Sequence, residues 1–303
     1  MDIKIIYEDD DLLVINKPSG VVVNKSESAK EETIQNWAEK KLGIFSEVVH
    51  VAQDARSDFS KNQSSRRSLS ESLSRNKKLK SNKIQTAFSS FANGQASENL
   101  DLEFINRGGI VHRLDKETSG ILLIAKNPRS FLNLQNQFAE RKVEKVYLAL
   151  VHGEVKPESG EINVPVGRLS FNRKRFGVVA GGRDSVTNYR VISNFKFPIS
   201  NETLTLLKLS PKTGRTHQIR VHLKYFGHPV FSDPLYGGRK TARKDRKVLP
   251  RLFLHASEIF FLHPKTGKEV SFESKLPQKL EEFLKTLSSI DGSIQLNKGR
   301  KIL

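Results

Sequence analysis

The chain has 303 residues, enough for one large domain or two small ones with a packed core. Its 51 Lys and Arg against 33 Asp and Glu give a formal net charge of +18. This surplus favours an anionic partner such as nucleic acid, although a basic protein without such a partner would carry the same charge. The complete absence of cysteine excludes disulfides, thiolate metal sites and covalent cysteine chemistry.

The first 43 residues predict a β-hairpin and an amphipathic helix. The expected elements before the helix are a hairpin over 3–15, a turn over 17–20 and a short strand over Val21–Val23. Thr33 can cap a helix that ends at Gly43, because one face of this segment carries apolar residues, namely Ile34, Trp37, Ala38 and Leu42.

No segment predicts secretion or a membrane span. Residues 1–15 lack a basic region followed by a long apolar region, and apolar runs such as 121–125 are far shorter than a bilayer requires. We therefore expect a cytoplasmic protein with no membrane partner.

The composition changes between about 45 and 107, where Ser, Asn, Lys, Arg and Gln dominate and few apolar residues occur. This composition predicts a disordered insert. We expect one domain over 1–290 that the insert interrupts, followed by a frayed basic tail over 291–303. The insert either tethers RNA or is an inert solvated loop, and the residues on which tethering would depend are Arg66, Arg67, Lys77, Lys78 and Lys80.

From Gly108 onward the pattern predicts a mixed α and β domain. Alternating apolar residues indicate strands at 147–151 and 205–209. A helix should begin with Asn127 as its cap and Pro128 at its first position, with one apolar face made by Phe131, Leu134 and Phe138.

Asp115 stands out in the segment 108–127, where apolar residues lead into His112, Arg113, Leu114 and Asp115. A carboxylate at the junction of a strand and a turn can face a cleft while its backbone stays rigid. The alternative is that Asp115 only stabilises the turn through its own backbone.

A second dense segment is 209–236. Thr216 can cap a helix with Ile219, Leu223 and Phe226 on one buried face, and Gly227 would end it. Arg220 lies off that face. It can either pair with a buried carboxylate or remain solvated on a phosphate-facing surface, and from this segment alone the solvated position is the default.

Metal and nucleotide cofactors are not indicated. The histidines do not form a His-Glu-x-x-His pair or come with an acidic ligand set, and no glycine-rich phosphate loop opens a helix after a strand. We therefore expect no metal and no cofactor.

The segments HRLDKETSG at 112–120 and GRTHQIRVHL at 214–223 resemble the signature segments of the RluA/RluD-type pseudouridine synthase family. Further matching pieces follow the family's order: YEDDDLLVINKPSGVVV near the start, QFAERKVEKVYLALVHGEV at 137–155, GHPVFSDPLYG at 227–237, RLFLHA at 251–256 and HPKTGKEVSFES at 263–274. The resemblance implies an α+β fold, with a bent, mixed and mainly antiparallel sheet, flanking helices and a central RNA cleft.

The resemblance also implies a cofactor-free isomerase that converts uridines to pseudouridine in ribosomal or transfer RNA. In that reading Asp115 is the nucleophile, Tyr147 the active-site tyrosine, and Arg220 the partner that keeps the Asp115 carboxylate ionised. We expect RNA or substrate contacts from His112, Arg113, Thr118, Arg215, His217 and Lys224.

Many relatives carry a small RNA-binding module ahead of the catalytic domain, whereas here we expect the catalytic domain to begin at residue 1. Asn24 and Ser232 stand where relatives often have His and Gly. We expect a monomer with no obligatory protein partner. Two rivals stay open: a catalytically silent RNA-binding or chaperone protein on the same fold, and a different base-handling enzyme such as a glycosylase. A zinc deaminase is disfavoured because its cysteine ligands are absent.

Overall fold

The computed structural model describes residues 1–26, 31–44, 98–170, 172 and 175–290. The basic residues proposed as an RNA tether lie outside this part of the chain, so that hypothesis stays a prediction. The elements in chain order are β1 (Lys4–Glu8), β2 (Leu12–Lys17), α1 (Ile34–Leu42), α5 (Glu98–Asn106), β3 (Ser119–Ala125), α6 (Pro128–Ala139), β4 (Glu144–His152), β5 (Ser159–Asn163), β6 (Val166–Arg168), β7 (Phe176–Val178), β8 (Val186–Lys196), β9 (Thr203–Pro211), α7 (Gln218–Tyr225), α8 (Arg239–Val248), β10 (Leu254–Leu262), β11 (Glu269–Glu273), α9 (Gln278–Lys285) and β12 (Ser288–Ser289).

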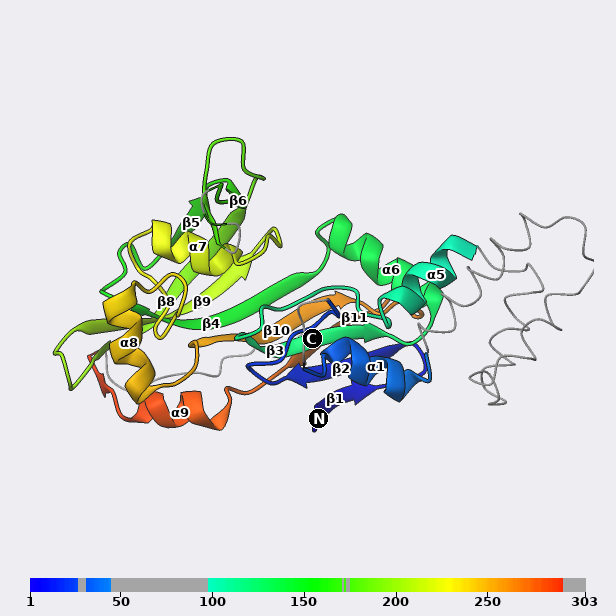
Figure 1. The fold of residues 1–303 in the computed structure, drawn as a ribbon, viewed down its shortest axis with the longest axis horizontal. Coiled ribbons are helices and arrows are strands. Elements are labelled where there is room, and N and C mark those ends of the chain that lie inside the picture. Colours follow the sequence, from blue (N-terminus) through cyan, green and yellow to red (C-terminus); the bar gives the residue numbers. More distant parts are fainter. Residues whose placement is uncertain (27–30, 45–97, 171, 173–174, 291–303) are drawn as a thin grey trace, which may run out of the picture.

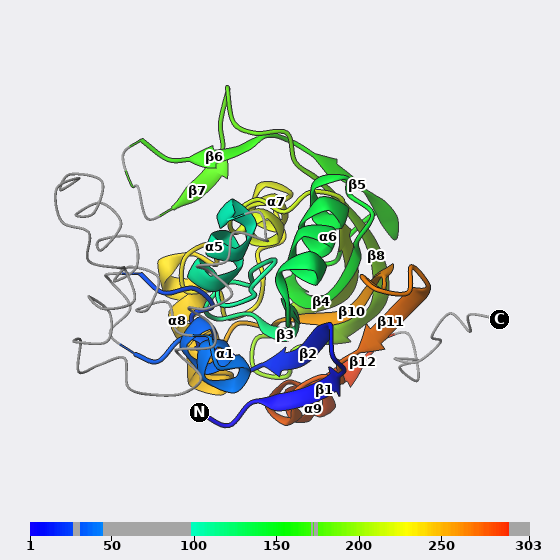
Figure 2. The same ribbon diagram turned by 90° about the vertical axis from the view of Figure 1, so that its right-hand side faces the viewer.

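Within the described residues, ten strands form one mixed sheet in the order β1-β2-β3-β10-β4-β9-β8-β12, with β11 paired to β10 and β5 paired to β8. The pairing of β3 with β10 is parallel, and the other pairings are antiparallel. Figure 2 shows that the sheet curves around α6. The predicted α+β class and the bent, mainly antiparallel sheet are confirmed.

Both faces of the sheet are buried, because alternate strand residues point to opposite sides. In β2, for example, Leu12 and Val14 pack beside α5 and α6, whereas Leu13 and Ile15 pack beside α1. In the other half of the sheet, α7 covers one face and α9 the other. Figure 1 shows α5, α6 and α7 on one side of the sheet and α1 and α9 on the opposite side.

Local capping signals were predicted correctly at two helices. The Thr33 side chain accepts a hydrogen bond from the Asn36 backbone N–H, and Gly43 ends α1 in the left-handed conformation. The Asn127 side chain caps α6 with Pro128 at the first position.

Three local predictions were wrong: the strand at 21–23, the cap at Thr216 and the far end of the insert. Residues 21–23 form no strand, because the carbonyls of Val22 and Val23 accept hydrogen bonds from the first N–H groups of α1. Thr216 does not cap α7, since His217 occupies that position with φ 57° and without a side-chain cap bond.

The predicted insert also extends too far, because α5 occupies Glu98–Asn106. The Phe104 ring is buried and meets the Phe131 ring edge-on at 5.8 Å, so this helix belongs to the core. In the described part of the chain, no helix is both long and apolar enough to cross a bilayer.

Candidate active site

Asp115 lies in a loop, residues 111–118, that leads directly into β3. The Thr118 N–H donates to the Asp115 carbonyl at 3.1 Å and closes a turn, while the Leu114 side chain is buried in the core beneath it. The turn at 17–20 holds the far side of this Asp115 loop. Gly20 N–H and Lys17 Nζ donate to the Lys116 carbonyl at 2.8 and 3.1 Å, and Ser19 Oγ donates to the Glu117 carbonyl at 2.6 Å.

The start of β3 passes unusually close to β10. Gly120 has φ 120°, and a Cβ at this position would lie 2.2 Å from the Ala256 carbonyl oxygen. Only glycine fits such an approach. Gly120, two residues after the Asp115 loop, therefore holds the start of β3 against β10.

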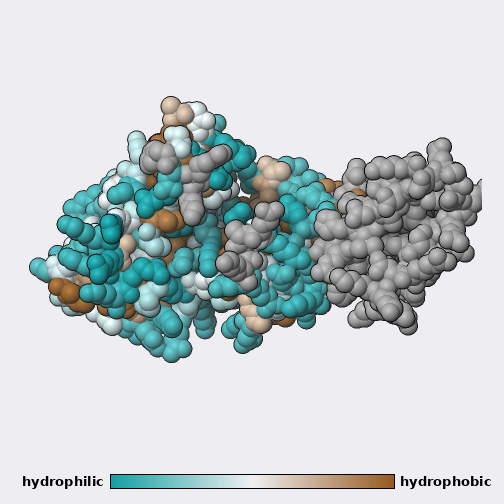
Figure 3. Space-filling model, in the orientation of Figure 1, coloured by the Kyte–Doolittle hydropathy of each residue, from teal (hydrophilic) through white to brown (hydrophobic). Residues whose placement is uncertain are grey.

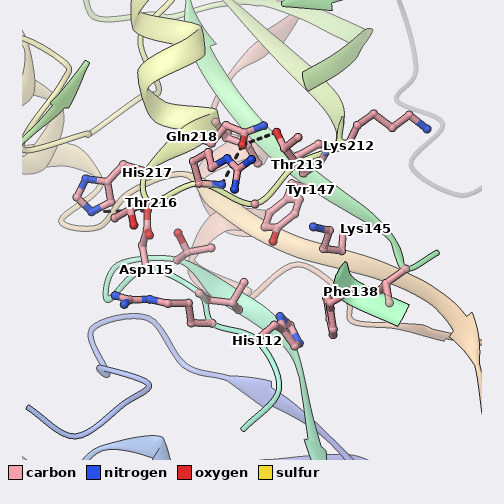
Figure 4. Close-up of a pocket in the computed structure, with 18 of the residues that line it drawn as sticks. His112, Asp115, Phe138, Lys145, Tyr147, Lys212, Thr213, Thr216, His217 and Gln218 are labelled. Atoms are coloured by element: carbon pink, nitrogen blue, oxygen red, sulfur yellow. Dashed lines mark hydrogen bonds and ion pairs between the residues drawn. The ribbon is translucent and has the colours of Figure 1, made fainter. Parts of the chain in front are cut away.

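The Asp115 carboxylate opens into a pocket of about 530 Å³, a volume typical of sites for small ligands. The Asp115 side chain is 17% exposed. The pocket lies between the Asp115 loop, the end of α6, the start of β4 and the loop 211–217 that precedes α7. Figure 4 shows the side chains of Asp115, Tyr147 and Lys145 directed into this space.

Arg220 contacts Asp115 from α7, with its Nη1 donating to Oδ2 at 3.3 Å. The guanidinium is buried and stacks over the Tyr236 ring at 5.0 Å. The prediction that Arg220 pairs with Asp115 is confirmed, and the solvated position that its own segment favoured is wrong. The helix backs onto the sheet, so that Arg220 points inward between packed residues.

The bidentate partner of Arg220 is Asp233, which the sequence analysis did not identify. Arg220 Nε and Nη2 donate to Asp233 Oδ2 and Oδ1 at 2.7 and 2.8 Å. The same carboxylate accepts the backbone N–H groups of Leu235 and Tyr236 at 2.8 and 3.0 Å. Burial opposes the charge of Arg220, but the hydrogen bonds and charge of Asp233, followed by those of Asp115, raise its pKa above the usual range. Arg220 is therefore a fixed cation.

Tyr147 enters the pocket from β4 and is partly buried. Burial, and then the negative charge of Asp115, raise the pKa of Tyr147 above its usual range, so the side chain is a neutral phenol at physiological pH. Among the described residues none forms a hydrogen bond with its hydroxyl group, which leaves this group free for a ligand.

Lys145 lies two residues before Tyr147 on the same face of β4 and was also missed from the sequence. Its Nζ is 5.9 Å from the centre of the Phe138 ring, and it forms no ion pair with any described residue. Burial lowers the pKa of Lys145 to about 8. An ammonium group held in a pocket without a protein counter-ion is suited to an anionic ligand.

The other predicted contact residues divide into two groups. Arg113, Arg215 and His217 line the pocket, with His217 Nδ1 at 2.9 Å from the Tyr236 hydroxyl and Nε2 at 4.0 Å from Asp115 Oδ2. Lys224 does not line it, because it lies on the exposed side of α7.

His112 and Thr118 also line the pocket. His112 Nε2 accepts the Leu123 N–H at 2.9 Å, and burial, with the charges of Lys145 and Arg107, lowers its pKa to about 3. This ring is a neutral structural acceptor. Thr118 Oγ1 is buried without a hydrogen-bond partner among the described residues, so it remains available to a ligand.

The pocket is strongly cationic. Asp115 is the only acidic residue among the described residues that line it, whereas Arg220 is accompanied by six other cations: Arg113, Arg141, Lys145, Arg183, Lys212 and Arg215. Such a lining concentrates an anionic ligand around a single carboxylate. No group of three or more His, Asp or Glu side chains within the described ranges is arranged to hold a metal ion.

Comparisons with known proteins identify the family of this chain. Residues 11–225 match the family model for RNA pseudouridylate synthase. The chain is 33% identical over 290 residues to an uncharacterised RNA pseudouridine synthase of Bacillus subtilis, covering 95% of this chain and 73% of that protein. It is 31% identical over 290 residues to ribosomal large subunit pseudouridine synthase D of Zymomonas mobilis, covering 94% and 73%.

A shorter match reaches 41% identity over 181 residues of an uncharacterised RNA pseudouridine synthase of Chloroflexus aurantiacus, covering 60% of this chain and 54% of that protein. Among solved structures, human RNA pseudouridylate synthase domain containing 1 superposes with a TM-score of 0.59 at 22% identity, covering 95% of this chain and 89% of that chain. This likeness supports the fold.

Proposed function

Since the chain belongs to the RNA pseudouridylate synthase family, a family of isomerases, we propose that it converts selected uridines of ribosomal RNA to pseudouridine with Asp115 as the nucleophile. The observation that carries this proposal is the contact between Asp115 and Arg220 in a cationic pocket that also contains Tyr147. The ribosomal substrate is proposed because several relatives are named as ribosomal large subunit enzymes.

The reaction is an isomerisation that needs no oxidant and no external energy. The C1′–N1 bond breaks, the detached uracil turns, C5 bonds to C1′, the C5 proton leaves and N1 takes up a proton. A carboxylate can act as the covalent catalyst, at the sugar or at the base, and Arg220 holds a positive charge beside Asp115 to keep it ionised.

Tyr147 is proposed to pack its ring against the uracil and to hydrogen-bond it. Because its raised pKa keeps Tyr147 in the neutral phenol form, almost no phenolate is present to remove the C5 proton, which favours the packing role. The target base must leave its stack to reach the pocket, at a cost of a few kcal/mol that is smallest for unpaired loops.

Two cationic surfaces are proposed to bind the RNA backbone. The first consists of the cationic side chains that line the pocket. The second is the outer face of α8, whose five cations are exposed and form no ion pair with described residues: Arg239, Lys240, Arg243, Lys244 and Lys247. Figure 3 shows a hydrophilic surface over this helix. Both surfaces would be sensitive to salt through the release of counterions from the RNA.

The test is tritium release from ribosomal RNA transcripts that carry uridine labelled at C5. We expect release with the wild-type protein and none with Asp115→Asn, while the RNA affinity of this variant stays near normal. Mapping of pseudouridines in cellular RNA with and without the gene identifies the substrate, and sites confined to transfer RNA would contradict the ribosomal proposal. If the chain is a catalytically silent RNA-binding protein, the wild-type protein will release no tritium. If it is a glycosylase, the reaction will produce free uracil.

A further inference from the structure

Ser232 adopts a backbone conformation that serine disfavours. Its φ is 62°, in the left-handed region that glycine occupies readily. The residue is fully buried, its Oγ donates to the Leu249 carbonyl at 2.5 Å, and its backbone N–H donates to Asp245 Oδ2 at 3.1 Å. Strained residues persist when their surroundings hold them in place, and here two hydrogen bonds do so.

Asp245 is the one acidic residue of helix α8; it is buried, and it binds His152 at the end of β4. His152 Nε2 lies 2.9 Å from Asp245 Oδ2, and its Nδ1 lies 3.0 Å from Glu202 Oε1. The imidazole also stacks on the Phe231 ring at 5.3 Å. Phe231 directly precedes Ser232, so His152 contacts this segment both through Asp245 and through the aromatic ring.

None of these three residues, His152, Asp245 and Ser232, lines the pocket. They are nevertheless connected to the site through the backbone, since Ser232 immediately precedes Asp233, the bidentate partner of Arg220. The neighbour of Asp245 on α8 reaches the site independently, because Arg246 Nη1 lies 3.7 Å from Glu117 Oε2 in the Asp115 loop. Helix α8 thus contacts both segments that bring Asp115 and Arg220 together.

We propose that His152, Asp245 and Ser232 form a positioning cluster that fixes Asp233 and, through it, the direction in which Arg220 presents its Nη1 to Asp115. The proposal rests on the function proposed above. Arg220 reaches Asp115 through one 3.3 Å hydrogen bond, so a small movement of Asp233 breaks it. A displacement of 1 Å at a reacting group can cost about 100-fold in rate.

The cluster should respond to pH. The groups that face His152 are Asp245 from α8, Glu202 from the chain before β9, and His228, whose Nδ1 is 2.8 Å from the His152 carbonyl. Burial opposes the charge of His152, but the hydrogen bonds and charges of Asp245 and Glu202 together raise its pKa. The charged form therefore predominates below that pKa. As the pH rises through it, a neutral ring is left with one N–H for two carboxylates.

The experiment compares the rates of tritium release by His152→Gln and Asp245→Asn with that of a matched control, His263→Gln. His263 is equally buried and its Nε2 lies 2.8 Å from Asp9 Oδ2, but this pair is at the turn between β1 and β2. We expect the two cluster variants to lose about 10- to 100-fold in kcat with KM within about twofold, whereas the control keeps its kcat despite a similar fall in Tm. The alkaline decline in kcat should be present in the wild type and absent from His152→Gln.

A second pair of variants leaves His152 in place. Ser232→Ala and Ser232→Gly both lose the bond to the Leu249 carbonyl and both keep the backbone N–H that binds Asp245. They differ in one respect, because alanine keeps the strained φ of 62° whereas glycine adopts it without strain. We expect Ser232→Gly to recover most of the kcat that Ser232→Ala loses. Equal rates for these two variants, or a wild-type kcat and pH profile for His152→Gln, would overturn the proposal.

An NMR measurement separates this proposal from the proposed function. The signal of the Arg220 Nε–H group, assigned from its loss in Arg220→Lys, should shift in His152→Gln and stay in place in His263→Gln. An unmoved signal refutes the positioning cluster even when the enzyme is active. Absence of tritium release from the wild type refutes the proposed function, whatever the signal does.

Discussion

Asp233→Asn tests the account of the site most directly, because it removes one charge with almost no change in volume. The carboxylate accepts four hydrogen bonds, two from Arg220 and two from backbone N–H groups. An asparagine whose oxygen stays at the Oδ1 position keeps three of them, but its amide then faces Arg220 Nε, and two donors oppose each other.

The expected loss of stability follows from this arrangement. The charge-assisted hydrogen bond that disappears is worth about 1.5–3 kcal/mol. Arg220, which is 2% exposed, would keep a single counter-charge, Asp115, at 3.3 Å. Removing one partner of a buried ion pair costs about 3–5 kcal/mol, and we expect the free energy of unfolding to fall by this amount. The kcat should fall by at least about 10-fold, since Nη1 is no longer fixed toward Asp115.

The assay is urea unfolding followed by circular dichroism and by the fluorescence of Trp37, the single tryptophan. Coincident transitions allow a two-state free energy to be extracted. Asp9→Asn is the control, because it removes a partly exposed carboxylate at the turn between β1 and β2. If Asp233→Asn lost less than about 1 kcal/mol and kept its kcat, the view that Asp233 holds Arg220 in place would be wrong.

Three further predictions concern RNA binding and the sheet. Lys145→Met should weaken RNA binding. Lys145→Arg should bind RNA better than the wild type at pH 9, because the ammonium charge of Lys145 is lost as the pH rises through its pKa of about 8, whereas arginine stays charged. Filter binding at pH 7 and pH 9 measures both effects. Replacing the exposed cations of α8 with Gln should lower the slope of log affinity against log salt by about 0.7–0.9 for each RNA phosphate that is no longer neutralised, and an unchanged slope would exclude α8 from the interface. Gly120→Ala should destabilise the protein by about 2–4 kcal/mol in urea unfolding, since the new Cβ would collide with the Ala256 carbonyl, and stability within about 1 kcal/mol of the wild type would show that β3 and β10 can separate without cost.

The sequence predicted those features that depend on neighbouring residues. Thr33 and Asn127 were recognised as caps because a cap acts within three residues of its own position. The strand at 21–23 was predicted from apolar character, but its carbonyls are used by α1, which a local pattern cannot reveal. Helix α5 was missed because Phe104 follows a polar insert and gains its burial from α6.

The site was predicted in part for the same reason. Resemblance placed Asp115, Tyr147 and Arg220 together, and the structure brings all three into one pocket. Asp233 follows a serine and precedes a proline, a context typical of a turn residue, and its ion pair forms with a helix 13 residues earlier in the chain. Lys145 was overlooked because a lysine on a strand is usually solvated, and its burial depends on α6 packing over β4.

The position of β10 bears on how the enzyme is made. Asp115 precedes β3 and Tyr147 lies on β4, yet these strands are not neighbours, because β10 lies between them and is synthesised after both. During translation, β1 to β3 and β4 to β9 can each pair locally, but among the described strands no ladder joins the two half-sheets until residues 254–262 have left the ribosome. A chain that ends before β10 therefore contains Asp115, Tyr147 and Arg220 but lacks the strand that joins their half-sheets, and we expect it to be inactive.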